Sequence, residues 1–195
     1  MIQSFLAELK IYFEQGGYVM PPLIVATVVL WTAIGYRFSL LKRGSARSVR
    51  ELLRRAKKGK LKKSKGMIDG AVLRGREVVK AHPDDPRPFL DGAFAGYEKE
   101  LRTYTALITS IIAVAPLLGL LGTVGGMIET FDSLGDMSLY SQSGGIAGGI
   151  SQALFTTQMG LAVAIPGLLA KGYLDRRQDK MEMELEQVKD LLVSR

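Results

Sequence analysis

The chain contains no cysteine and only one histidine among its 195 residues. Without cysteine it has no disulfide framework, no thiol nucleophile and no cysteine metal site. His82 lies in the stretch His82-Pro83-Asp84-Asp85-Pro86, where an imidazole beside two carboxylates could bind a metal. Prolines and paired aspartates are typical turn residues, so we interpret the stretch as a turn. We therefore expect no metal, no cofactor and no enzymatic activity.

Charge is absent from three long stretches. No charged residue or histidine occurs between Glu14 and Arg37, between Arg102 and Glu129, or between Asp136 and Lys171. About 20 apolar residues at 1.5 Å each cross the ~30 Å hydrocarbon core of a bilayer. The sequence predicts an all-α membrane protein with three transmembrane helices, none of which carries a titratable group at its core.

Basic residues predict the orientation of these helices. Lys10 alone precedes the first span, 19 of the 26 Lys and Arg residues lie in residues 37–102, and six follow Ala170. The positive-inside rule then places the N-terminus in the periplasm and the C-terminus in the cytoplasm. The predicted segments are a periplasmic amphipathic helix (1–17), transmembrane helix 1 (18–37), a basic cytoplasmic segment (38–102), transmembrane helix 2 (103–128), a short periplasmic turn (129–148), transmembrane helix 3 (149–170) and a cytoplasmic helical tail (171–195).

The hydrophilic segments also show helical patterns. Residues 49–56 and 67–81 each predict a helix, and the proline-free stretch 89–103 predicts that the second span begins as a helix in the cytoplasm. Positions in the tail alternate in steps of four and three, namely Leu174, Gln178, Met181, Leu185, Val188 and Leu192. Such a heptad seam packs helices together, so we expect the tail to continue the third span as one long helix.

Glycines recur at helical spacing in and beside the second and third spans. Gly122 with Gly126, Gly144 with Gly148, and Gly145 with Gly149 each form a GxxxG pair. Small residues four apart let helix backbones approach closely, which favours packing against other helices. The alternative is a monomeric bundle with internal glycine contacts. The predicted helix-packing residues are Gly119, Gly122, Gly126, Gly145, Gly149, Gly160, Pro116 and Pro166.

A few polar residues lie at membrane depth, namely Thr123 in the second span and Gln152, Thr156, Thr157 and Gln158 in the third. Polar side chains in a membrane usually face a bundle interior or a wet cavity. We predict a pore or proton path along Thr123, Gln152, Thr156 and Thr157. In the alternative interpretation the glutamines lie in the interface and the threonines bond to their own helix backbone.

The densest basic run lies within residues 47–65 and follows the first span. Such a run could bind nucleic acid, but its position favours cytoplasmic retention and contact with anionic lipid. Recruitment of a cytoplasmic protein stays open. The predicted anchoring residues are Lys57, Lys58, Lys60, Lys62 and Lys63.

Two of the apolar stretches carry a family resemblance. Residues 115–128, Ala-Pro-Leu-Leu-Gly-Leu-Leu-Gly-Thr-Val-Gly-Gly-Met-Ile, resemble the second-span signature of the MotA/TolQ/ExbB proton-channel family. Residues 149–154, followed by Thr157 and residues 160–166, are similar to its third-span signature. The three-span topology with the N-terminus outside agrees with the ExbB and TolQ branch.

The resemblance implies a pentameric ring in the bacterial inner membrane whose second and third spans line a central pore. It also implies a single-span partner resembling ExbD or TolR, whose aspartate carries the proton, and delivery of work to a TonB-like protein. The signature threonines match at Thr123 and Thr157. Gln152 departs from the glutamate that ExbB and TolQ often carry, which leaves open the ion and the driven system. A scaffold ring that positions a single-span partner without ion flow is the alternative function.

Overall fold

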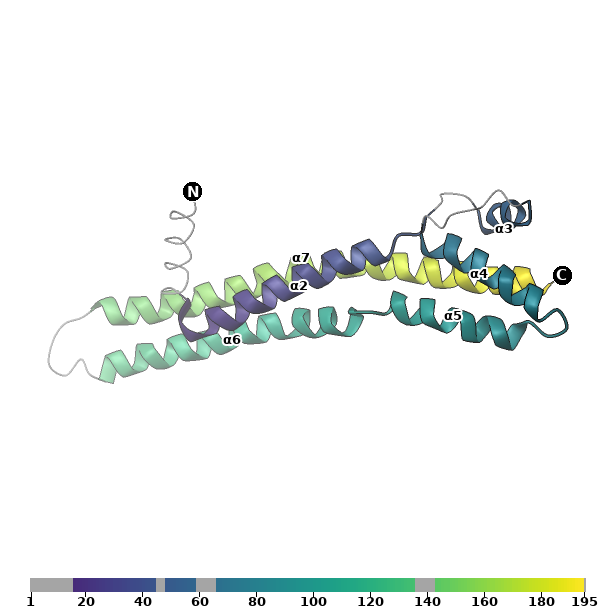
Figure 1. Ribbon diagram of the computed structural model, residues 1–195. Coiled ribbons are helices and arrows are strands. Elements are labelled where there is room, and N and C mark those ends of the chain that lie inside the picture. The colour runs from purple at the N-terminus through teal and green to yellow at the C-terminus, as the bar shows by residue number, and fades with distance from the viewer. Residues whose placement is uncertain (1–15, 45–47, 59–65, 136–142, 195) are drawn as a thin grey trace. The chain divides into compact units, whose positions relative to one another are not determined.

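The computed structural model describes residues 16–44, 48–58, 66–135 and 143–194, and their regular structure is helical (Figure 1). The elements are η1 (Gly17–Val19), α2 (Met20–Leu40), α3 (Val49–Lys57), α4 (Met67–Ala81), α5 (Arg87–Leu101), α6 (Thr105–Gly135) and α7 (Ser143–Val193). The predicted all-α class is thereby confirmed. The predicted helix over residues 1–17 lies almost wholly outside the described residues, as do Lys60, Lys62 and Lys63.

The chain folds into two compact units. Unit 1 comprises residues 1–34 and 106–171, and unit 2 comprises residues 35–105 and 172–195. Unit 1 holds most of the apolar sequence, while unit 2 holds most of the charged sequence. Each unit has buried apolar side chains of its own.

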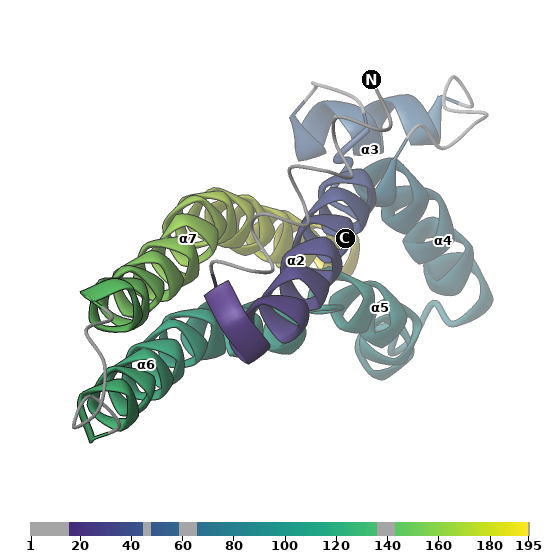
Figure 2. The same cartoon turned by 90° about the vertical axis from the view of Figure 1, so that its left-hand side faces the viewer.

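Unit 1 contains the apolar parts of three helices that are long and apolar enough to cross a membrane, as the sequence predicts. Its buried core includes a cluster of Met20, Leu23, Ala115 and Ala164, contributed by α2, α6 and α7. The antiparallel helices α6 and α7 lie side by side in both views (Figures 1 and 2).

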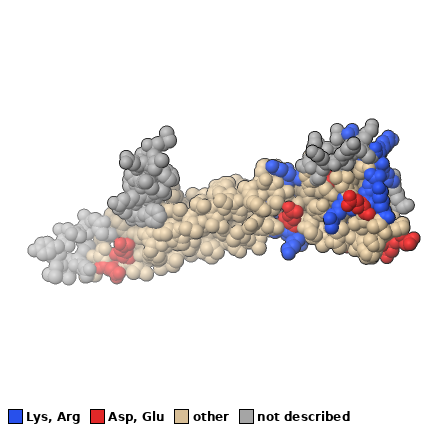
Figure 3. Space-filling model, in the orientation of Figure 1, with Lys and Arg blue, Asp and Glu red and all other residues tan. Residues whose placement is uncertain are grey.

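Most large apolar side chains of unit 1 point away from this core. Leu117, Leu154 and Leu169 are among the most exposed, and Leu169 has 71% of its surface accessible. Figure 3 accordingly shows a band of helix surface on which neither Lys and Arg nor Asp and Glu appear. An apolar surface of this extent is covered in the functional state by lipid or by other protein.

Helix α7 runs without interruption for 51 residues, which confirms that the third span and the tail form one helix. In unit 2 the predicted seam is buried at Leu174, Met181, Leu185, Val188 and Leu192. These residues supply the apolar face on which α7 packs inside its own chain.

The helix before the second span ends earlier than the sequence predicts. Residues Arg102–Tyr104 form a turn between α5 and α6, and Tyr104 adopts a φ of 61°. Two i to i−3 bonds hold this turn, from the Thr103 amide to the Glu100 carbonyl and from the Thr105 amide to the Arg102 carbonyl, both at 3.2 Å. A left-handed residue cannot continue an α-helix, so the charged extension of the second span is helical but interrupted.

The two predicted helices in the basic segment are confirmed as α3 and α4. Ser48 caps α3 by accepting a hydrogen bond from the Glu51 amide at 3.4 Å. The stretch from His82 to Pro86 connects α4 to α5 without regular structure, in agreement with the predicted turn, and the His82 ring stacks on Phe89 with centroids 3.6 Å apart.

Candidate functional site

Glycines form the contact between α6 and α7 in unit 1. Gly119, Gly122 and Gly126 are buried on α6. A Cβ atom added to Gly126 would lie 2.6 Å from the Gly149 carbonyl oxygen, and one added to Gly160 would lie 2.7 Å from the Ala115 carbonyl oxygen. Real Cβ atoms do not approach backbone this closely, so the two helices can touch here only through glycine.

This contact settles how most of the predicted packing glycines are used inside the chain. Five of them lie at the α6–α7 interface, namely Gly119, Gly122, Gly126, Gly149 and Gly160. These are contacts within one chain, as the alternative prediction of internal glycine contacts expects. The interface therefore gives no evidence for contacts between copies. Of the remaining predicted packing residues, Gly145 lies in the first turn of α7, and Pro116 and Pro166 lie inside α6 and α7.

The predicted pore residues differ in their surroundings. Thr156 is fully buried against Gly122, and its hydroxyl donates to the Ala153 carbonyl of its own helix at 3.0 Å. Thr123 is partly exposed and donates to the Leu120 carbonyl, also in its own helix, at 2.6 Å. Thr156 is thus enclosed by α6 and α7 of one chain, which gives it a packing role whatever else it does.

Thr157 and Gln152 make contacts that reach beyond their own helix. The Thr157 hydroxyl donates across the interface to the Gly119 carbonyl at 3.2 Å. The Gln152 amide lies close to Gly17, at the start of the first apolar helix. Both side chains are partly exposed. The structure brings Thr156 and Thr157 together against α6, while their role in a pore stays a prediction, as does that of Thr123 and Gln152.

Sequence reasoning missed a buried arginine in unit 2. Arg37 lies in the last turn of α2 with only 1% of its surface accessible. Its Nη1 donates to Asp175 Oδ1 at 2.9 Å, and its Nη2 donates to Gln178 Oε1. The only advance signal was the polar Gln178 in an otherwise apolar seam, which the structure now pairs with the guanidinium.

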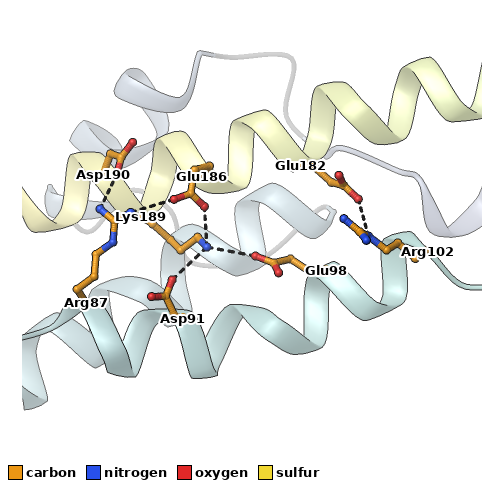
Figure 4. A network of polar contacts seen from close by, with 8 residues as sticks. All are labelled: Arg87, Asp91, Glu98, Arg102, Glu182, Glu186, Lys189 and Asp190. Carbon is orange, nitrogen blue, oxygen red and sulfur yellow. Dashed lines mark hydrogen bonds and ion pairs between the residues drawn. The ribbon is translucent and has the colours of Figure 1, made fainter.

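A second group of charges joins α5 to the end of α7, and sequence reasoning missed it as well (Figure 4). Lys189 Nζ lies 3.1 Å from Asp91, 3.2 Å from Glu98 and 2.6 Å from Glu186. Arg87 bonds to Glu186 and Asp190, and Arg102 bonds to Glu182. Apart from the Lys189–Glu186 contact within α7, these contacts join side chains that lie 80 to 103 positions apart in sequence.

The three carboxylates around Lys189 change its titration. Burial lowers the pKa of Lys189, but hydrogen bonds from its ammonium to Glu186, Asp91 and Glu98 outweigh burial and raise the pKa well above its ordinary value of 10.5. A raised pKa means that the folded state holds the proton more tightly than the unfolded state. The stabilisation is therefore fully present below pH 10.5 and is lost as the pH rises further.

We expect Lys189→Met to lower the free energy of unfolding by about 1–2 kcal/mol at pH 7, a modest value because the partner carboxylates are about half exposed. The deficit should stay constant from pH 7 to pH 9 and shrink above pH 10.5. Titration from mild detergent into SDS, followed by circular dichroism, measures it. Lys180→Met on the exposed face of the same helix is the control, and equal effects of the two variants would contradict the network.

The chain is similar to several known proteins. A family model described as the MotA/TolQ/ExbB proton channel family matches residues 48–187. The "Putative biopolymer transport protein ExbB-like 1" of Synechocystis sp. is 35% identical over 170 residues, which cover 80% of this chain and 66% of that protein. "Biopolymer transport protein exbB1" of Vibrio cholerae is 37% identical over 125 residues, covering 60% and 55%. "Biopolymer transport protein ExbB" of Aquifex aeolicus is 34% identical over 94 residues, covering 48% and 63%. The chain thus spans less than two thirds of the length of these relatives.

Proposed function

Since the chain belongs to the MotA/TolQ/ExbB proton channel family, we propose that it is the ring-forming subunit of a proton-driven motor in the bacterial inner membrane. In this proposal five copies form a pore together with a single-span partner that resembles ExbD or TolR. Proton flow through the pore moves the partner, and the work passes to an envelope-spanning process such as TonB-dependent transport. The N-terminus is periplasmic and the C-terminus cytoplasmic, as the distribution of basic residues predicts.

One observation carries the proposal: the apolar parts of α2, α6 and α7 contain no Asp, Glu, Lys, Arg or His, yet those of α6 and α7 hold hydroxyl and amide groups. Neither an amide nor a hydroxyl binds and releases protons near neutral pH. Protons then pass either through a carboxylate supplied by the partner or along water held by the Thr and Gln side chains. Thr123, Gln152 and Thr157, all partly exposed, are the predicted pore residues that could bond to a carboxylate or to water.

The energy available is sufficient for mechanical work. One charge crossing the membrane releases about 2.3 kcal/mol per 100 mV. A carboxylate in low dielectric strongly favours its neutral form unless polar groups stabilise its charge. A ring in which Thr123, Gln152 and Thr157 stabilise the charged form of a partner aspartate in one orientation would tie each proton transfer to one step of the partner.

Native mass spectrometry of the complex, with and without a co-expressed single-span partner whose helix carries an aspartate, tests the assembly. A pentamer that retains the partner is the expected result. A monomer or dimer that ignores the partner would mean that the glycine faces serve only the α6–α7 contact, and the proposal would be wrong.

Proton flux tests the pore itself. We expect the double variant Thr157→Val and Gln152→Leu to reduce partner-dependent proton uptake into liposomes about tenfold, because one lost charge-assisted hydrogen bond costs about 1.5 kcal/mol or more. Thr27→Val is the control, since the Thr27 hydroxyl donates to the Leu23 carbonyl of its own helix at 2.7 Å. Undiminished uptake in the double variant would contradict the proposed path.

A scaffold ring without ion flow is the second candidate function, and the absence of Asp, Glu, Lys, Arg and His from the described apolar helix segments is compatible with it. The two candidates differ in one observable. A motor loses proton uptake when the partner's aspartate is replaced by asparagine, whereas a scaffold shows no uptake before or after that change.

A further inference from the structure

Unit 2 contains a cavity of about 740 Å³ between α3, α4 and the end of α7. Arg50, Arg54 and Lys57 line it from α3, at positions four and three residues apart, so they share one face of that helix. Arg76 and Lys80 line it from α4, four residues apart. No acidic side chain is among its lining residues in the described part of the chain.

Several cations of unit 2 form ion pairs with carboxylates. Arg37, Arg87 and Lys189 each contact a carboxylate. Around the cavity, by contrast, Arg50, Arg54, Lys57 and Lys80 pair with no carboxylate of the described residues.

The fifth cation that lines the cavity, Arg76, bonds to the backbone of α3. The Arg76 guanidinium donates to the Ala56 and Lys57 carbonyls and thereby closes the C-terminus of α3. It also fixes α3 beside α4, so the row of cations on α3 is held facing the row on α4. Figure 3 shows Lys and Arg side chains gathered over this region.

Apart from Ser194, the remaining wall of the cavity is apolar. Leu53, Val79 and Leu192 contribute to it, one from each of the three helices. A concave site of this size with an apolar wall and a few convergent charged groups matches a small organic ligand. Guanidinium groups bind phosphate through paired hydrogen bonds, and several unpaired cations favour a ligand with more than one negative charge.

The position of the cavity along α7 argues for a soluble ligand. Ala170 ends the apolar part of α7, and Leu191 at the cavity follows 21 residues later in the same helix. At 1.5 Å per residue this is about 32 Å of helix. The headgroup layer of a bilayer extends only about 5–8 Å beyond the hydrocarbon core.

We propose that this cavity binds a water-soluble organic phosphate with at least two negative charges, of the nucleoside diphosphate class. The phosphates contact the cations of α3 and α4, and the organic part packs on Leu53, Val79 and Leu192. The site goes beyond the proposed motor function, and it contains none of the residues assigned to the proton path.

The test uses the full chain in nanodiscs of phosphatidylcholine, with ADP and inorganic pyrophosphate as probes in isothermal titration calorimetry. We expect both probes to bind. Arg54→Gln should weaken the binding of both about tenfold, since it removes one charge-assisted contact. Arg74→Gln removes the same charge from an exposed position on α4 outside the cavity, and it should change binding less than twofold. Leu53→Asn should weaken ADP binding more than pyrophosphate binding.

Three results would overturn the proposal. The first is the absence of binding of either probe to the unmodified chain. The second is equal weakening by Arg54→Gln and Arg74→Gln, which would indicate attraction to net charge alone. The third is that the cavity binds neither probe and that the chain interacts only with vesicles that contain phosphatidylglycerol. That result would assign the cavity to a lipid headgroup. Circular dichroism of each variant confirms that its helices are intact.

Discussion

Replacing Gly126 by valine should separate α6 from α7 and lower the free energy of unfolding by about 3 kcal/mol or more. A Cβ atom at this position would lie 2.6 Å from the Gly149 carbonyl oxygen and 2.9 Å from the Ala153 amide nitrogen. Both atoms belong to the backbone of α7, so no side-chain rotation can relieve the overlap. The two helices must move apart, because backbone atoms of α6 and backbone atoms of α7 are in direct contact at this interface. Titration of the purified protein from mild detergent into SDS measures the loss.

Gly148→Val is the matched control for this prediction. Gly148 lies on α7 beside Gly149, but apart from its own neighbouring residues and helix backbone, no heavy atom of the described chain lies within 4 Å of the position that its Cβ would occupy. We expect its free energy of unfolding to stay within about 0.5 kcal/mol of that of the unmodified chain. If both variants unfold at the same SDS fraction, the close approach of α6 and α7 at Gly126 and Gly149 is wrong.

Replacing Arg37 by alanine should cost about 2–3 kcal/mol of stability, below the 3–5 kcal/mol typical of a broken buried ion pair because Asp175 is partly exposed. The variant removes a fully buried side chain, the cation 2.9 Å from Asp175 and the donor to Gln178. Since these partners lie on α7, the loss should loosen α7 from the end of α2 within unit 2. The same SDS titration measures it.

Two further variants show whether charge or geometry matters at this site. Arg37→Lys retains the charge but loses the planar fork that reaches both partners, so we expect an intermediate loss of about 1–2 kcal/mol. Arg176→Ala removes an exposed arginine from α7, and it should have almost no effect. A loss for Arg176→Ala as large as that for Arg37→Ala would show that net charge, not the buried contact, stabilises this region.

Much of the fold follows from local sequence patterns. The three apolar helices, α3 and α4, and the continuous α7 were all predictable, because span length and helical periodicity are properties of a few neighbouring turns. The turn at Tyr104 was not predictable on this basis, since its left-handed backbone has no glycine or asparagine to announce it.

The candidate sites, too, could be predicted only in part from the sequence. The polar residues at membrane depth, Thr157 and Gln152 among them, and the family signatures are visible in the sequence because they interrupt an otherwise apolar pattern. What each residue contacts is not visible there. The spacing of Gly122 and Gly126 predicts a close helix contact, but it does not say whether the partner helix belongs to the same chain or to another copy.

By itself, then, the sequence determined that this protein is helical, has three helices able to cross a membrane and belongs to its family, because each of these rests on residues close together in the chain. Only the tertiary structure decided that Gly119, Gly122 and Gly126 face α7, that Arg37 bonds to a residue 138 positions away, and that Lys189 joins α5 to α7. Such contacts depend on how distant segments pack, and local periodicity carries no information about which distant segment will lie opposite.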